Sequence, residues 1–173
     1  MENKLATTDT AIETKRAIKE LSDKFLKKLS TPPKPTAIRK NEYAGNSKYL
    51  PIAYIESQLD RLFPGTWQIK NITYQQLLNA VIVTVDLLVK HPISGEWLTF
   101  VGIAASDVQT KKGSKILDAD TISPQALQRD IPKVKAEALK NACKSLGNAF
   151  GRNLNRNWDF SHIADKEDNY EIV

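Results

Sequence analysis

The sequence DIPKVKAEALKNACKSLGNAFGRNLNR, residues 130–156, has the apolar spacing of one long amphipathic helix. Asp130 is the expected N-cap, Pro132 suits the first turn, where a missing N–H costs nothing, and Gly151 is the expected stop. The pattern therefore predicts a helix that ends at Phe150 and packs one face on the rest of the domain. The apolar residues of that face are Leu139, Ala142, Cys143, Leu146, Ala149 and Phe150.

A second face of the predicted helix is basic, although Glu137 shares it. Arg152 and Arg156 extend the positive charge past the helix end, so that the segment has six basic and two acidic residues. This charge density favours a row of phosphate contacts, with a solvated helix face as the alternative. Three lysines lie within roughly 40° of one another on this face: Lys133, Lys140 and Lys144.

Gly147 is unusual inside a predicted helix, because glycine there costs about 1 kcal/mol relative to alanine. It forms a small-xxx-small pair with Gly151, and Ala142 and Ala149 add little bulk. Small residues allow another backbone to come close. We expect either tight packing against a sheet or the approach of a phosphate backbone.

Residues 135–154, KAEALKNACKSLGNAFGRNL, resemble the closing helix of the Rad-fifty-two type single-strand annealing proteins and of their bacteriophage relatives, the Sak-type recombinases. The resemblance centres on Lys140 and on the run KSLGNAFG, residues 144–151. A second block, YIE at 54–56 followed by FPGTW at 63–67, resembles the family's entry into its sheet. The resemblance covers roughly residues 35–156 and implies a β-β-β-α core.

The resemblance implies ATP-independent binding of single-stranded DNA and annealing of complementary strands in homologous recombination and DNA repair. The implied partners are single-stranded DNA, its complementary strand and other copies of this chain in a ring or helical homo-oligomer. A host single-strand-binding protein is a further candidate partner. Lys140 and Lys144 match basic positions of the family, whereas Asn141 stands where relatives can carry another basic residue, which predicts a less charged inner site.

The expected fold class is α+β, with an antiparallel three-stranded β-meander packed against the long C-terminal helix and with additional N-terminal helices. Alternating apolar residues predict strands at Trp67–Tyr74, Leu78–Lys90 and Glu96–Ala104. A short helix is expected at Pro51–Phe63, and residues 123–129 are expected to add a helical turn before the main helix.

The chain divides into three regions by composition. Residues 1–34 hold a predicted helix, Thr10–Leu29, and a proline-rich linker, and residues 35–156 form the core domain, which the resemblance implies is the single-strand annealing core. Residues 157–173 form an acidic tail with one lysine and five acidic residues. Such a tail competes for a basic groove, recruits a partner or is inert.

Further basic residues lie outside the helix face. Residues 37–49 and 102–123 read as loops that either touch the phosphate backbone or are ordinary surface. The sequence KKGSK at 111–115 lacks the first glycine of a nucleotide-binding loop, so nucleotide binding is not expected. Together with the helix, these segments give the candidate DNA-binding residues Lys140, Lys144, Lys133, Arg152, Arg39, Lys40, Lys48, Lys111, Lys112, Lys115, Arg129 and Arg156.

Composition bounds the remaining possibilities. The 173 residues suffice for one domain with a core, and the net charge of +5 permits a nucleic-acid partner. The single cysteine, Cys143, excludes an intrachain disulfide and any multi-cysteine zinc site, so a reducing cytoplasm is the expected location. The resemblance to bacteriophage proteins implies that this is the cytoplasm of a bacterial host cell. No apolar run approaches a membrane span, and the polar start is not that of a signal peptide.

No paired-carboxylate, nucleophile-elbow or metal-ligand spacing occurs, and His91 and His162 stand alone. Binding is therefore expected without catalytic residues, metal or cofactor. The alternative function is a protein that binds and protects DNA ends without annealing them, and a nuclease ranks third.

Overall fold

The computed structural model describes residues 2–42, 45–77, 80–108 and 126–156, and for residues 2–11, 77, 126 and 127 it describes the backbone alone. The elements follow one another as α1 (Glu2–Ser30), η1 (Pro35–Ala37), β1 (Arg39–Asn41), β2 (Ser47–Tyr49), α2 (Ile52–Leu62), β3 (Trp67–Leu77), β4 (Ala80–Lys90), β5 (Trp97–Asp107), α3 (Ala126–Lys144) and η4 (Asn148–Phe150).

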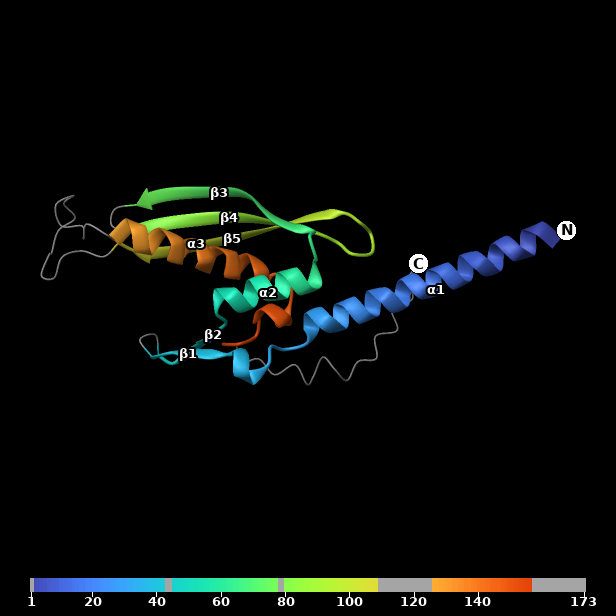
Figure 1. Ribbon diagram of the computed structural model, residues 1–173, viewed down its shortest axis with the longest axis horizontal. Coiled ribbons are helices and arrows are strands. Elements are labelled where there is room, and N and C mark those ends of the chain that lie inside the picture. The colour runs from blue at the N-terminus through green and yellow to red at the C-terminus, as the bar shows by residue number, and fades with distance from the viewer. Residues whose placement is uncertain (1, 43–44, 78–79, 109–125, 157–173) are drawn as a thin grey trace, which may run out of the picture.

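Strands β3, β4 and β5 form an antiparallel sheet in chain order, and α3 lies along one face of it (Figure 1). Alternate residues of the central strand are buried on the helix side, as the period of two predicts. The predicted α+β meander with a C-terminal helix on its face is thus confirmed. The buried residues of β4 on this side are Val81, Val83, Val85, Leu87 and Val89.

Gly102 of β5 lets α3 come very close to the sheet. A Cβ atom at this position would lie 2.0 Å from the Ala138 carbonyl oxygen and 2.5 Å from the Ala142 amide nitrogen. Both atoms belong to the backbone and cannot turn aside, so only glycine fits. The expected close approach at Ala142 is confirmed, and the glycine that permits it comes from the sheet.

The predicted boundaries of the main helix are wrong at both ends. Helix α3 begins at Ala126, so Asp130 is a buried residue inside the helix instead of its N-cap, and Pro132 lies beyond the first turn. The expected turn before the main helix is therefore part of α3 itself. The helix ends at Lys144, and the chain continues through a turn into η4 before Gly151.

Gly147 lies in that turn and not inside a helix. A Cβ atom there would lie 2.5 Å from the Leu29 carbonyl oxygen, so the end of α1 packs directly against this turn. The expected backbone approach to Gly147 is confirmed, but the partner is a helix end and not a sheet.

Helix α1 starts earlier than predicted and projects from the body (Figure 1). Its C-terminal part packs on the body through Leu29 and Phe25. The Phe25 ring lies edge-on to the rings of Phe63 and His91, with 5.7 Å between ring centroids in each pair. Farther from the body, Ile18 and Leu21 are exposed. In the part of the chain that is described, no helix is long and apolar enough to cross a membrane.

The predicted loop at 37–49 contains a short hairpin that the sequence analysis missed. Strands β1 and β2 pair antiparallel, with Arg39 opposite Tyr49 and Lys40 opposite Lys48. Lys111, Lys112, Lys115 and the acidic tail at 157–173 lie outside the described residues.

Candidate nucleic-acid interface

A small hollow of about 40 Å³ lies where the hairpin meets the C-terminal half of α3. Two parts of the chain that are far apart in the sequence contribute to it: β2 with α2, and α3 with the chain from η4 onward. Its polar and aromatic lining residues are Lys48, Tyr49, Glu137, Lys140, Lys144, Phe150 and Asn155.

Asn155 fixes the hairpin to the chain after η4. Its Oδ1 accepts a hydrogen bond of 2.8 Å from the Lys48 amide, and its Nδ2 donates one of 2.7 Å to the Lys48 carbonyl. The side-chain amide thus pairs with both backbone groups of Lys48, as a neighbouring strand would. Because an isolated two-stranded hairpin is marginally stable, this anchor holds β2 against the hollow.

Lys140 lies beneath the surface of the hollow. The residue is only 8% exposed, its Nζ lies 2.5 Å from the Glu137 Oε1, and the same nitrogen lies 5.3 Å from the centroid of the Tyr49 ring. The predicted row of phosphate contacts did not include this cover over Lys140. The hairpin, which was not expected, covers this part of the helix face.

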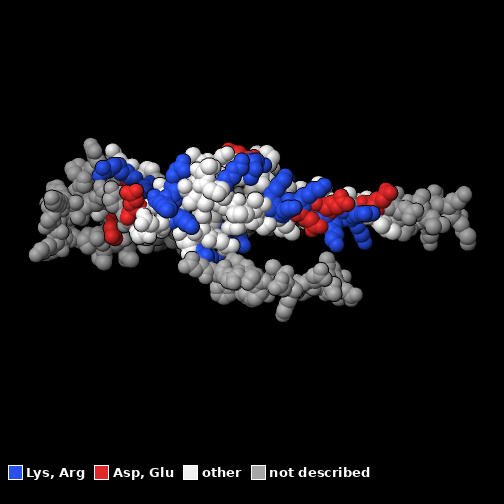
Figure 2. Space-filling model, turned by 90° about the horizontal axis from the view of Figure 1, so that it is seen from below, with Lys and Arg blue, Asp and Glu red and all other residues white. Residues whose placement is uncertain are grey.

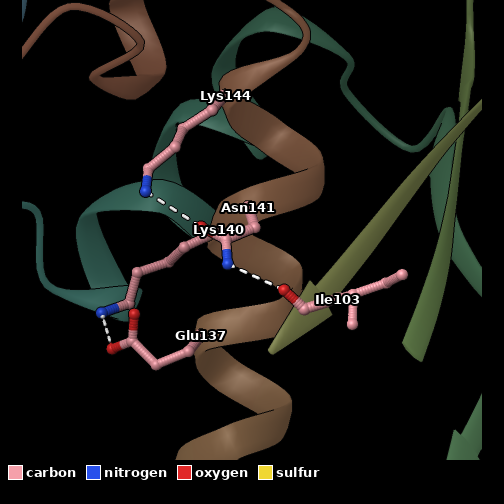
Figure 3. A network of polar contacts seen from close by, with 5 residues as sticks. All are labelled: Ile103, Glu137, Lys140, Asn141 and Lys144. Atoms are coloured by element: carbon pink, nitrogen blue, oxygen red, sulfur yellow. Dashed lines mark hydrogen bonds and ion pairs between the residues drawn. The ribbon is translucent and has the colours of Figure 1, made fainter. Parts of the chain in front are cut away.

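Lys144, one turn farther along α3, is exposed and held in place by a relay of hydrogen bonds (Figure 3). Its Nζ donates to the Asn141 Oδ1 at 2.9 Å, and the Asn141 Nδ2 donates to the Ile103 carbonyl at 2.9 Å. Asn141 therefore ties the helix to β5 and orients the lysine.

Arg152 is both an exposed positive charge and part of the end of α3. Its Nε donates to the Lys144 carbonyl at 2.9 Å, and its Nη2 donates to the Ser145 carbonyl. Carbonyl groups at a helix C-terminus lack intrahelical partners, and a cation there is favoured by the helix dipole. The guanidinium is thereby fixed beside Lys144, and we call Lys48, Lys140, Lys144 and Arg152 the basic corner.

The hairpin adds positive charge at the rim of the basic corner. Lys40 stands directly opposite Lys48, and both are exposed. Arg39 is exposed as well, but its Nη1 donates to the Thr36 carbonyl at 2.8 Å. Figure 2 shows that the charged side chains seen over the middle of the body are mainly Lys and Arg, whereas basic and acidic side chains alternate along α1.

The other predicted site residues lie away from the hollow. Lys133 is exposed two turns before Lys140, or about 10 Å along the helix axis, and Arg129 lies about 16 Å before it. Arg156 is exposed at the end of the described chain. The structure therefore brings Lys48, Lys140 and Lys144 together and leaves the N-terminal half of the predicted lysine row apart.

Tyr49 and Asn155 are the lining residues that the sequence analysis missed. Nothing in the sequence signals Asn155, because its partner Lys48 is 107 residues away. Tyr49 adjoins a lysine in a basic segment, which is a weak sign of a cation–π contact.

Cys143 lies on the packed face of α3, as predicted, and is fully buried. Burial raises the pKa of its thiol to about 12, and the negative charge of Glu56 adds to the increase. The thiol stays protonated at neutral pH and is not a nucleophile.

Among residues 2–42, 45–77, 80–108 and 126–156, no three His, Cys, Asp or Glu side chains gather as a metal-binding group. The sequence matches no protein-family model and no curated protein.

Proposed function

We propose that this protein binds single-stranded DNA through its phosphates at the basic corner and anneals complementary strands without ATP. The observation that carries the proposal is the gathering of basic side chains from two distant segments, β2 and α3, around one hollow, with Arg152 fixed beside Lys144 at the end of α3. The basic corner has four basic residues, and Glu137 is the one acidic residue among the described ones that line the hollow. A surface of this charge attracts a polyanion.

The hairpin gives a second argument. Like charges directly opposite each other on paired strands are destabilising by a few tenths of a kcal/mol up to about 1 kcal/mol. Lys40 and Lys48 form such a pair on a hairpin of only three residues a strand. A phosphate backbone lying across the hairpin would offset this repulsion, which favours a binding role over an ordinary surface turn.

The size of the hollow bears on how a strand would lie. Its volume of about 40 Å³ is room for only a few water molecules, since each needs roughly 10–15 Å³ of such space, so a nucleobase does not fit inside. Phosphate oxygens would face the lysines and the bases would point outward. Binding of this kind carries no sequence preference and leaves base edges free to pair with a second strand.

The resemblance to the Rad-fifty-two type and Sak-type proteins supports the same proposal. It further suggests rings or helical assemblies, in which the basic corners of neighbouring copies would form one continuous track. Such a track would hold one strand extended while a complementary strand tests its register by base pairing.

The experiment that tests the proposal is annealing of two complementary labelled oligonucleotides by the purified protein, without ATP or metal, across a salt series. We expect acceleration at low salt that fades as salt is added. Tight binding without acceleration would overturn annealing and favour a DNA-end-protecting protein. Absence of strand binding at low salt would overturn both functions.

A further inference from the structure

The ion pair inside the hollow is unevenly exposed. The Lys140 side chain is 10% exposed and the Glu137 side chain 48% exposed, with 2.5 Å between Nζ and Oε1. Figure 3 shows the two side chains extending to the same side of α3 and meeting at their tips. An anion that comes from solvent therefore meets the carboxylate before it reaches the ammonium.

We propose that Glu137 is an internal competitor of the DNA phosphate for Lys140, an inference that rests on the proposed strand binding. A phosphate within contact distance of Lys140 would lie beside the carboxylate, and two anions that close repel each other. The Tyr49 ring covers another side of the ammonium. The carboxylate must therefore swing outward when a strand engages Lys140.

This competition selects a polyanion over a single phosphate. Free phosphate or a mononucleotide has to displace Glu137 with one contact. A strand also contacts Lys48 and Lys144, which are exposed and carry no acidic partner in the described structure. Those contacts raise the effective concentration of the next phosphate at Lys140, so a strand can displace the carboxylate where a single phosphate cannot.

The first test measures binding of a labelled oligothymidylate to the full chain by fluorescence anisotropy. Glu137→Gln removes the competing charge and retains a similar shape, so we expect binding roughly threefold to tenfold tighter at low salt. Glu20→Gln is the matched control, because it removes the same charge from an exposed helical ion pair on α1, and we expect no change.

A second comparison shows whether Glu137 acts through Lys140. In a Lys140→Gln background, the Glu137→Gln substitution should give no gain in strand affinity, because the lysine for which the carboxylate competes is gone.

A third test uses inorganic phosphate alone. At matched ionic strength, phosphate should raise the melting temperature of Glu137→Gln and leave that of the wild-type protein unchanged.

Equal or weaker strand binding by a folded Glu137→Gln protein would overturn the inference, as would an equal gain in the Lys140→Gln background. Circular dichroism checks the fold, and Glu137→Ala is a second neutral variant if the first does not fold. If the wild-type protein binds no strand at low salt, the proposed function fails and this inference fails with it. Wild-type binding without a Glu137 effect overturns the inference alone.

Discussion

Helices α1 and α3 each pair a basic residue with a glutamate along one side, but in different surroundings. On α1, Arg16 and Glu20 are 3.8 Å apart and their side chains are 83% and 59% exposed. On α3, Lys140 and Glu137 are 2.5 Å apart, and the lysine lies beneath the hairpin. An exposed pair contributes about 0–1 kcal/mol, whereas an ammonium shielded from water depends on its partner.

A basic and an acidic residue three or four positions apart on a helix therefore do not define a role by themselves. Such a spacing, four residues on α1 and three on α3, gives a surface pair on α1 and the centre of a candidate site on α3. What differs is the neighbour, because α1 projects from the body whereas α3 is packed against the sheet and the hairpin (Figure 1).

The largest difference between the two helices should be the loss of stability when carbon atoms are added at their surfaces. Gly102→Ala would place a methyl group 2.0 Å from the Ala138 carbonyl oxygen, so we expect the free energy of unfolding to fall by about 3 kcal/mol or more. On α1, Ala17→Val adds carbon atoms at an exposed position and should cost about 0.5 kcal/mol. Denaturant unfolding of the two variants checks this, and similar losses would contradict the close packing of α3 on β5.

The two ion pairs should respond differently to loss of the acid. Glu137→Ala leaves the Lys140 ammonium without its partner, and we expect a loss of about 1–2 kcal/mol in the free energy of unfolding. Glu20→Ala should cost less than about 0.5 kcal/mol. Chemical denaturation at low salt measures both losses, and equal losses would show that the hairpin does not shield Lys140.

The packed face of α3 contains one buried ionisable thiol, that of Cys143, which makes stability depend on pH. Because burial raises its pKa to about 12 from 9.0, the folded protein holds the proton more tightly than the unfolded chain does. The resulting stability is fully present below pH 9 and is lost as pH rises toward 12. Between pH 8 and pH 10, the free energy of unfolding of the wild type should fall. We expect this fall to be about 1 kcal/mol larger than the fall for Cys143→Ala. Urea unfolding at the two pH values measures it, and parallel losses in both proteins would contradict the burial of the thiol.

Local periodicity was enough to predict the sheet and the helix on its face. The alternation in β4 marks every second residue as buried, and the helical spacing places Leu139, Ala142 and Cys143 in the core. These patterns depend only on which face of an element meets apolar neighbours. Each of these patterns can be recognised from the residues of one helix or strand alone.

The remaining features depend on contacts between distant segments. The turn that follows Lys144 at the end of α3 packs against α1, where Gly147 meets Leu29, and no local pattern contains that contact. The hairpin was missed because its strands have three residues each and bury none of them, so no alternation marks them. The burial of Lys140 could not be predicted from the helix alone, because the side chain that covers it, Tyr49, belongs to this hairpin.

The central claim is that the basic corner, and not positive charge in general, binds the strand. The most direct test is the salt dependence of oligothymidylate affinity for three proteins: the wild type, Lys48→Ala/Lys144→Ala in the basic corner and Lys15→Ala/Lys19→Ala on α1. All four lysines are exposed, so both variants should fold and both lose the same charge. We predict that the basic-corner variant binds roughly tenfold more weakly at low salt, with a salt slope shallower by about 1.4, and that the α1 variant matches the wild type. Equal losses in the two variants would contradict the assignment of the strand to this surface.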